Sequence, residues 1–224
     1  MNISQKSATI LFDLDGTLVD SVPDMLTAMN RSLVELGRPA VSASALRGWV
    51  GDGVATLIRR ALIATGGLSD DLVQTMQAAY LRNYDGHTAD ESRPYPEVEN
   101  VLHQLSAEGY RLAVCTNKPT SLSLQMLESL GLRALFSAVV GGDAVPQRKP
   151  DPGHLLVALA AAGGDRDHVV MVGDSINDVE AARAAGIPVV AVSFGYSRRP
   201  PAELGADLLI DHFSVLPDAV RRFF

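Results

Sequence analysis

The 224-residue sequence has little cysteine, and Cys115 is its single thiol. One cysteine cannot form a disulfide within the chain or a zinc site of several thiolates, so a disulfide-stabilised fold is excluded and a reducing compartment is favoured. The sequence also lacks the roughly 18 consecutive apolar residues of a membrane span. Residues 1–6 lack the basic flank and apolar segment of a secretory signal. We therefore expect a cytoplasmic protein outside the membrane.

Positive charge is scarce as well. Lys and Arg total 19 against 26 Asp and Glu, which gives a net charge of −7. This balance argues against nucleic acid or an anionic membrane as the main partner. A small anionic substrate would need a metal ion or a few placed cations. We expect a small anionic ligand, bound by a monomer or homodimer.

Several common catalytic motifs are missing. The sequence has no Gly-Lys dipeptide for a Walker loop, no G-x-S-x-G elbow and no H-E-x-x-H spacing among its five histidines. Cys115 is not followed by the arginine of a cysteine-dependent phosphatase loop, because the sixth residue after it is Ser121. We expect Cys115 to be a buried strand residue.

Short apolar segments alternate with helical patterns in the second half of the chain. The patterns predict strands at 8–12, 112–115, 138–140, 169–172, 189–192 and 208–210, and helices at 97–107, 119–130, 152–162 and 177–185. Strands that are apolar throughout indicate a parallel sheet with helices on both faces. The predicted fold class is α/β, with a doubly wound, Rossmann-like core.

Residues 20–90 carry helical patterns and none typical of a strand. Apolar stripes predict helices at 23–36, around 54–62 and around 72–80. We therefore predict a catalytic core of residues 1–19 and 91–224, with an all-helical cap of residues 20–90 inserted after the first strand. Open α/β sheets bind ligands at the carboxyl ends of their strands, so this cap should cover the site.

Four polar segments follow expected strands, at 13–17, 116–118, 148–150 and 173–178. The carboxyl ends of parallel strands share one edge, so these segments should converge. Asp13 and Asp15, two residues apart, should face the same side, and Asp174 adds a third acid. Three oxygen ligands suit Mg²⁺, while Lys149 and the Thr116 hydroxyl would bind phosphoryl oxygens. The set predicts a phosphoryl-transfer site.

Each segment alone also has a simpler interpretation. Asp174 or Ser175 would serve as a helix cap, and Asp178 would favour the positive end of the same helix. Lys149 would be an exposed loop lysine, and Thr116 would bond its own backbone.

The four segments in order resemble the motifs of the haloacid dehalogenase superfamily of phosphohydrolases. They read DLDGTLVDS at 13–21, TNKP at 116–119, KP at 149–150 and GDSIND at 173–178. Within that superfamily the chain is most similar to the bacterial phosphoglycolate phosphatases, through WVGDG at 49–53, GGD at 141–143 and FGY at 194–196. Related phosphatases and a hexose-phosphate mutase share several of these secondary matches.

The resemblance implies a role for each acid. Asp13 would attack phosphorus and form an aspartyl-phosphate, and Asp15 would be the general acid and base. Mg²⁺ would be held by Asp13, the backbone carbonyl of Asp15, and Asp174. Asp178 would join the outer shell of the metal.

The resemblance also implies that Thr116, Asn117 and Lys149 bind phosphate. In the cap, Gly51 and Arg60 are the candidates for substrate specificity, Arg60 because its planar fork would match a carboxylate. An exposed helix arginine and a hinge glycine are the simpler interpretations of these two residues.

The expected reaction is the Mg²⁺-dependent hydrolysis of 2-phosphoglycolate to glycolate and phosphate. Other small-molecule phosphatases of the superfamily, a pyrophosphatase and a sugar-phosphate mutase remain open alternatives. A phospho-acceptor signalling domain also combines clustered acids with a Thr and a Lys, but it has no use for the second acid or for a cap.

Overall fold

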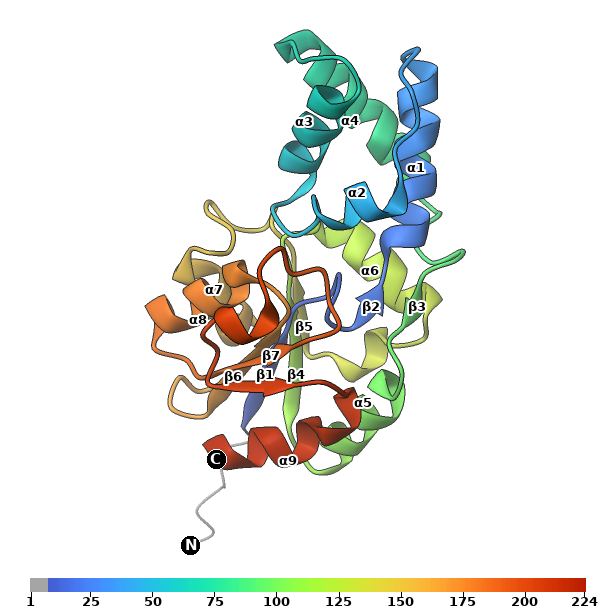
Figure 1. Ribbon diagram of the computed structural model, residues 1–224. Coiled ribbons are helices and arrows are strands. Elements are labelled where there is room, and N and C mark those ends of the chain that lie inside the picture. The colour runs from blue at the N-terminus through green and yellow to red at the C-terminus, as the bar shows by residue number, and fades with distance from the viewer. Residues whose placement is uncertain (1–7) are drawn as a thin grey trace, which may run out of the picture.

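The structure is a computed structural model that describes residues 8–224, and it is built on a six-stranded sheet (Figure 1). Every neighbouring pair in the order β5-β4-β1-β6-β7-β8 is parallel. The strands are β1 (Thr9–Phe12), β4 (Arg111–Cys115), β5 (Ala138–Val140), β6 (Val169–Gly173), β7 (Val189–Val192) and β8 (Leu208–Ile210). Residues 1–6, considered above for a secretory signal, lie outside the described residues.

Both faces of the sheet are buried, which explains why its strands are apolar throughout. In β1 the side chains of Ile10 and Phe12 join one hydrophobic core, and that of Leu11 joins the other. Successive side chains of a strand point to opposite faces, so these two cores lie on the two sides of the sheet. Cys115 ends β4 fully buried, as expected, and burial raises the pKa of its thiol to about 12.

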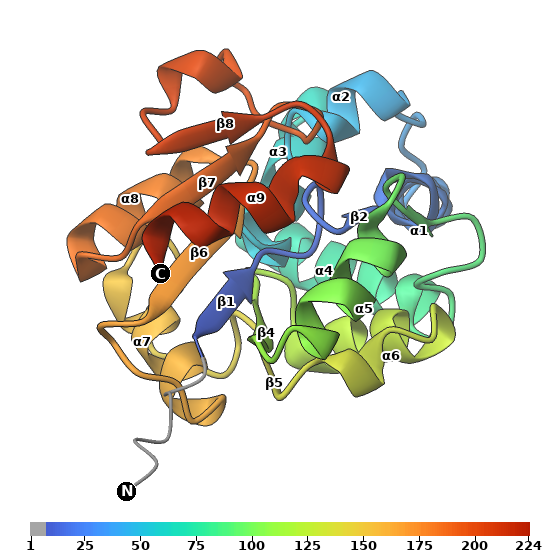
Figure 2. The same ribbon diagram turned by 90° about the horizontal axis from the view of Figure 1, so that it is seen from below.

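Helices cover each face (Figure 2). Helices α7 (Pro152–Ala161) and α8 (Ile176–Ala185) pack on one side. Helices α5 (Val98–Ala107), α6 (Thr120–Ser129) and α9 (Leu216–Val220) pack on the other. Short 3₁₀ turns lie at Arg133–Leu135, Pro201–Glu203, Phe213–Val215 and Arg221–Phe223. The doubly wound α/β prediction is confirmed.

Four helices leave the core after β1 and stand beyond the sheet (Figure 1). They are α1 (Val22–Glu35), α2 (Ala43–Arg47), α3 (Val54–Ala64) and α4 (Asp70–Tyr84), called the cap helices below. Helix α4 begins where the Ser69 hydroxyl accepts a hydrogen bond from the Leu72 backbone. Its buried side packs against α1 and α3. None of the helices in residues 8–224 is both long and apolar enough to cross a membrane.

A short antiparallel ribbon joins the cap helices to the core, and the sequence did not predict it. It pairs β2 (Val19–Asp20) with β3 (Arg93–Pro94). Two residues per strand are too few for a recognisable pattern. The ribbon is secured by the buried Asp24 carboxylate, which accepts hydrogen bonds from the backbone N–H groups of Glu91 (3.0 Å) and Ser92 (2.8 Å). The two chain crossings between cap and core are therefore held together.

Candidate active site

Three acids from two adjacent strand ends meet at one place. Asp13 directly follows β1 and Asp174 directly follows β6, while Asp178 lies in the first turn of α8. One carboxylate oxygen from each lies within 4.8 Å of the other two. The three residues are 7%, 3% and 0% exposed. The first and fourth polar segments of the sequence thus converge.

The acid cluster is short of positive charge. Burial raises the pKa of Asp13 to about 6; the Lys149 charge opposes this rise, and Asp178 and Asp15 add to it. Burial, together with the charges of Asp13 and Asp178, raises the pKa of Asp174 well above its ordinary value. Among the described residues no group makes a hydrogen bond to Asp13 Oδ1. Buried carboxylates that repel one another fit a hard divalent cation.

Two glycines let the backbone approach Asp174 closely. A Cβ on Gly16 or on Gly195 would collide with the Asp174 carboxyl group. Gly16 also has a φ of +89°, which side chains disfavour. The Tyr196 backbone N–H donates to Asp174 Oδ2 at 2.5 Å. The Asp174 carboxyl group is therefore fixed by glycine on two sides and by one backbone donor.

Lys149 is fully surrounded by oxygen atoms of the site. Its Nζ donates to Asp178 Oδ1 and to the Cys115 carbonyl, both at 2.6 Å, and lies 3.1 Å from Asp13 Oδ1. The contact with Asp13 is an ion pair and not a hydrogen bond. Burial disfavours the ammonium, yet the charges of Asp13 and Asp178 raise the pKa of Lys149 overall. Lys149 is therefore a buried, fixed positive charge and not an exposed loop lysine.

Asp178 contributes both to the start of α8 and to the site, while its expected place beside a metal stays a prediction. Its Oδ2 accepts from the backbone N–H of Ser175 at 3.0 Å and from the Ser175 hydroxyl at 2.6 Å. These bonds make a capping box at the start of α8. Its Oδ1 meanwhile holds Lys149. Helix capping and site construction coexist in this residue.

Asn117 connects three segments around the site. Its Nδ2 donates to the carbonyl oxygens of Gly51 and Lys149, each at 2.9 Å. Its Oδ1 is buried without a partner among residues 8–224. The Thr116 hydroxyl oxygen accepts the Lys118 backbone N–H at 3.3 Å. Both residues border the same cavity as Asp13.

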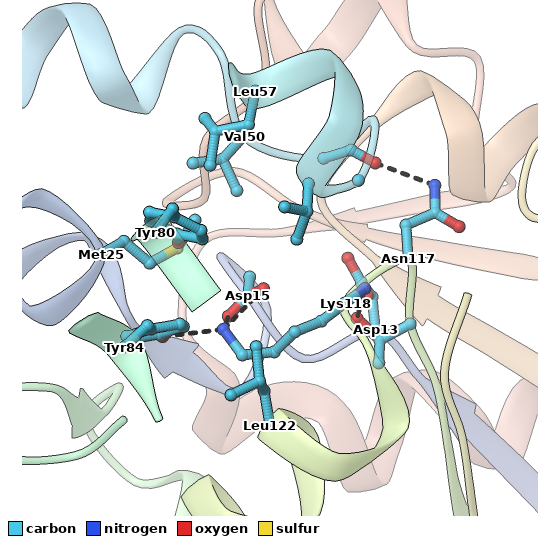
Figure 3. Close-up of a pocket in the computed structure, with 14 residues that line it drawn as sticks. Asp13, Asp15, Met25, Val50, Leu57, Tyr80, Tyr84, Asn117, Lys118 and Leu122 are labelled. Atoms are coloured by element: carbon cyan, nitrogen blue, oxygen red, sulfur yellow. Dashed lines mark hydrogen bonds and ion pairs between the residues drawn. The ribbon is translucent and has the colours of Figure 1, made fainter. Parts of the chain in front are cut away.

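Sequence reasoning missed the residue that contacts Asp15. Lys118 Nζ lies 3.1 and 3.3 Å from the two Asp15 carboxylate oxygens and donates to the Tyr84 hydroxyl at 2.8 Å (Figure 3). The lysine stands in the Thr-Asn-Lys segment, next to two predicted phosphate ligands. That position was the available signal. Tyr84 comes from the end of α4, and no sequence pattern connects it to the site.

Two cavities border the site. The smaller, about 30 Å³, lies between core and cap helices and is lined by Asp13, Asp15, Thr116, Asn117 and Lys118 together with mostly apolar cap side chains. The larger, about 340 Å³, borders Asp15 and Asp174 and is rimmed by Arg198 and Arg199. Only the smaller one is bordered by Asp13.

The two cap residues predicted to contact substrate differ in position. Gly51 borders both cavities, and its carbonyl oxygen accepts from Asn117 and from Asn177. Arg60 borders neither. Its guanidinium is 2.5 Å from the Asp52 carboxylate and donates to the Trp49 carbonyl at 2.9 Å. The structure thus gives Arg60 protein partners outside the cavities, and contact with substrate stays a prediction.

Comparison with known proteins gives consistent matches. The family model described as haloacid dehalogenase-like hydrolase matches residues 10–192. The phosphoglycolate phosphatase of Caulobacter vibrioides is 44% identical over 213 residues, covering 95% of this chain and 90% of its own. That of Rhodospirillum rubrum is 44% identical over 214 residues, with 93% and 89% covered. The crystal structure of a predicted phosphoglycolate phosphatase from Haemophilus somnus superimposes with a TM-score of 0.90 at 33% identity, covering 96% of this chain and 99% of that one.

Proposed function

The chain belongs to the haloacid dehalogenase-like hydrolases, and from that membership we propose that it hydrolyses 2-phosphoglycolate to glycolate and phosphate through a phosphorylated Asp13. The enzyme is accordingly a phosphoric monoester hydrolase. The substrate is supported by the nearly full-length similarity to relatives named phosphoglycolate phosphatase. The mechanism is supported by one observation above all, the Asp13 and Asp15 carboxylates bordering the same small cavity.

In the proposed reaction an Asp13 oxygen attacks phosphorus and the P–O bond to glycolate breaks. Asp15 gives a proton to the departing glycolate oxygen, since an alkoxide is a poor leaving group. Asp15 then takes a proton from the water that attacks the aspartyl-phosphate. Inorganic phosphate leaves and Asp13 is restored, so bonds and protons balance over the cycle.

The remaining residues of the site are proposed to bind the phosphoryl group and to hold the segments of the site together. Lys149 and the Thr116 hydroxyl are proposed to bind phosphoryl oxygens, where a fixed cation acts without reorganisation. Asn117 holds the cap loop at Gly51 and the backbone at Lys149 through bonds already described, and its Oδ1 is buried without a partner in residues 8–224. Lys149 also keeps Asp13 and Asp178 together.

The family uses a divalent metal, and we propose Mg²⁺ here. Asp13, the Asp15 backbone carbonyl and Asp174 would hold the ion, and Asp178 would stand beside it. The close approach of the Asp13, Asp174 and Asp178 oxygens and the raised pKa values of Asp13 and Asp174 support this assignment. Bound Mg²⁺ would neutralise the carboxylates and the phosphoryl group.

Some expectations from sequence remain proposals about the whole chain. We propose that residues 1–19 and 91–224 form the catalytic core and residues 20–90 the cap, which the ribbon of β2 and β3 at both crossings supports. We also propose a cytoplasmic monomer or homodimer without a nucleic acid partner, supported by the net charge of −7 and the single cysteine.

The test is phosphate release from 2-phosphoglycolate, a hexose phosphate and pyrophosphate, with Mg²⁺ and with a chelator. We expect the highest kcat/KM for 2-phosphoglycolate, no turnover with chelator, and none in a folded Asp13→Asn variant. A higher kcat/KM for another substrate, or sugar phosphate isomerised without phosphate release, contradicts the proposed substrate. Release that stops after one equivalent contradicts hydrolysis and favours a phospho-acceptor domain.

A further inference from the structure

We propose that the Lys118 ammonium and the Tyr84 hydroxyl bind the carboxylate of the substrate and so select phosphate esters that carry a carboxylate beside the ester oxygen. The inference rests on the proposed function and assigns its specificity to two residues, one from the core and one from α4. Neither residue was expected from sequence to contact substrate.

Charge in the smaller cavity points to Lys118. Among the described residues that line this cavity, Lys118 carries the one basic side chain, and Asp13 and Asp15 carry the acidic ones. The neighbouring walls are apolar, from Met25, Leu57 and Leu122 among others (Figure 3). An anionic group placed here has one counter-ion available, and the low polarity of the walls strengthens that attraction.

The hydrogen-bond donors of this pair are incompletely used. The Lys118 ammonium donates to both oxygens of the Asp15 carboxylate and to the Tyr84 hydroxyl. The Tyr84 oxygen accepts from Lys118, while its own O–H has no acceptor in residues 8–224. Tyr84 is 1% exposed. The buried Tyr84 O–H, beside the Lys118 charge, therefore remains available to an acceptor oxygen of an anionic ligand.

The spacing suits a carboxylate next to the ester oxygen. An ester oxygen that receives a proton from Asp15 must lie beside the Asp15 carboxylate. Lys118 Nζ is 3.1 Å from Asp15 Oδ1 and so lies near the same ester oxygen. In 2-phosphoglycolate one CH₂ group separates the ester oxygen from the carboxylate carbon.

Other cations of the region are less suitable. Arg60 is held by Asp52 and the Trp49 carbonyl and borders neither cavity. Arg198 and Arg199 border the larger cavity, which Asp13 does not reach. A substrate attacked by Asp13 has to occupy the smaller cavity, where Lys118 is the basic side chain.

The experiment compares kcat/KM for 2-phosphoglycolate and for ethyl phosphate, which has no carboxylate, in the full-length enzyme with Mg²⁺. In Lys118→Met we expect the preference for 2-phosphoglycolate to fall roughly 30-fold or more, the range for removing one partner of a buried charge pair. In Tyr84→Phe we expect about a 10-fold fall, for one hydrogen bond to a charged group. Arg199→Gln, at the rim of the other cavity, is the control and should keep the preference.

The ester without a carboxylate separates the two ways in which Lys118 can act. If both esters lose activity by the same factor in Lys118→Met, the lysine acts only through Asp15 and the inference is overturned. If the variant keeps the wild-type preference, the inference alone fails. If the wild-type enzyme shows no preference for 2-phosphoglycolate, the proposed substrate fails first, and the inference with it.

Thermal denaturation establishes whether Lys118→Met folds. If it does not, Tyr84→Phe decides, because it removes one oxygen and keeps the ring. An unchanged preference in that variant overturns the two-residue site, and a 10-fold loss confined to 2-phosphoglycolate supports it.

Discussion

His154, a fully buried histidine, holds the backbone that carries Lys149. Its Nδ1 accepts the Lys149 backbone N–H at 3.3 Å, and its Nε2 donates to the Val140 carbonyl at 3.2 Å. The bond accepted by Nδ1 requires the neutral ring, because a protonated Nδ1 has no lone pair to accept it. Burial, together with the charge of Lys149, lowers the pKa of His154 to about 4. No sequence pattern singles out this residue.

We predict that His154 makes the fold sensitive to acid. The folded pKa of about 4 lies below the ordinary value of 6.5, so the neutral ring contributes stability above pH 6.5 that is lost as the pH falls toward 4. Against His154→Gln, which does not titrate, the stability advantage of the wild type should shrink by about 2 kcal/mol between pH 7 and pH 5. Urea denaturation at the two pH values measures this difference.

The comparison with His154→Gln is needed because Asp13 changes the free energy of unfolding with pH in the opposite direction. Its pKa is raised to about 6, so its contribution grows as the pH falls through that range. Both proteins contain Asp13, and the difference between them isolates His154. An advantage that stays constant with pH contradicts the assignment of a neutral, bonded imidazole.

For individual residues, the sequence predicted which acids converge but not which side chains contact them. Asp13 and Asp174 follow strands, and the common edge of a parallel sheet determines where they lie. Lys118 contacts Asp15 and Tyr84, which are distant in sequence, and that contact depends on how α4 packs above the sheet. The pairing of Arg60 with Asp52 depends on the turn at 51–53, and helical periodicity carries no information about such a turn.

Among the elements, the ends of β1 and β6 form the candidate metal site, and we predict that Mg²⁺ stabilises the fold through it. A ligand that binds only the folded chain at about 100 times its Kd adds about 2.7 kcal/mol. For a chain of this size that amounts to a rise in Tm of roughly 5–10 °C. The Tm measured with and without MgCl₂ checks the expectation.

The specificity of that rise has two controls. Asp174→Asn should abolish it, because one charged ligand is lost. NaCl at matched ionic strength should not reproduce it in the wild type. An equal rise in Asp174→Asn or with NaCl would mean that Mg²⁺ acts elsewhere or by screening.

Tyr196 links the start of α1 to the core. Its hydroxyl donates to Asp20 at 2.5 Å and accepts from the backbone N–H of Ser21 at 2.8 Å and of Val22 at 3.3 Å. Since the first N–H groups of a helix lack partners within the helix, this hydroxyl serves as an external cap. The Tyr196 hydroxyl oxygen therefore holds the start of α1 to the core.

We predict that Tyr196→Phe loosens the connection without disturbing Asp174, whose donor is the backbone N–H of residue 196. Loss of these bonds should lower the free energy of unfolding by about 1–3 kcal/mol. Amide exchange at Ser21 and Val22 should become at least about 10-fold faster. Hydrogen-exchange NMR measures both amides. Tyr110→Phe, on the far side of the core, is the matched control and should leave them unchanged.

The elements themselves were largely predictable where they are long or fully apolar. The strand at 189–192 and the helix at 177–185 agree with β7 and α8 to within one residue. Helices α2 and α9, of five residues each, were not predicted. So few residues hold too little periodicity to separate them from loops, and packing against the rest of the chain determines their structure.

For the whole molecule, the central feature is the contact of the cap loop at 50–54 with the core. An insertion after the first strand had to emerge at the ligand-binding edge, so its place was predictable. The contacts that hold it there were not, because they join Gly51 and Asp52 to Asn117, Asn177 and Arg198 from three separate core segments. These contacts close one side of both cavities.

Asp52 is the charged centre of this contact. Its carboxylate lies 2.5 Å from Arg60 of the cap, 2.6 Å from Arg198 and 2.7 Å from Asn177 of the core. Burial alone would raise the pKa of Asp52, but hydrogen bonds from Asn177, Arg60 and Arg198 lower it overall. The carboxylate is therefore ionised at neutral pH and bridges the two parts.

We predict that Asp52→Asn releases the cap loop more often while the core stays folded. The variant keeps the shape of the side chain but loses both ion pairs, which are partly exposed and contribute at most about 1 kcal/mol each. The free energy of unfolding should therefore fall by no more than about 2 kcal/mol. Amide exchange within residues 51–54 should become roughly 10-fold faster, because local opening costs less than global unfolding.

Asp70→Asn is the matched control, since Asp70 pairs with Arg59 at 3.8 Å on the cap surface. Equal exchange rates in the two variants would mean that the Asp52 ion pairs do not hold the cap loop to the core.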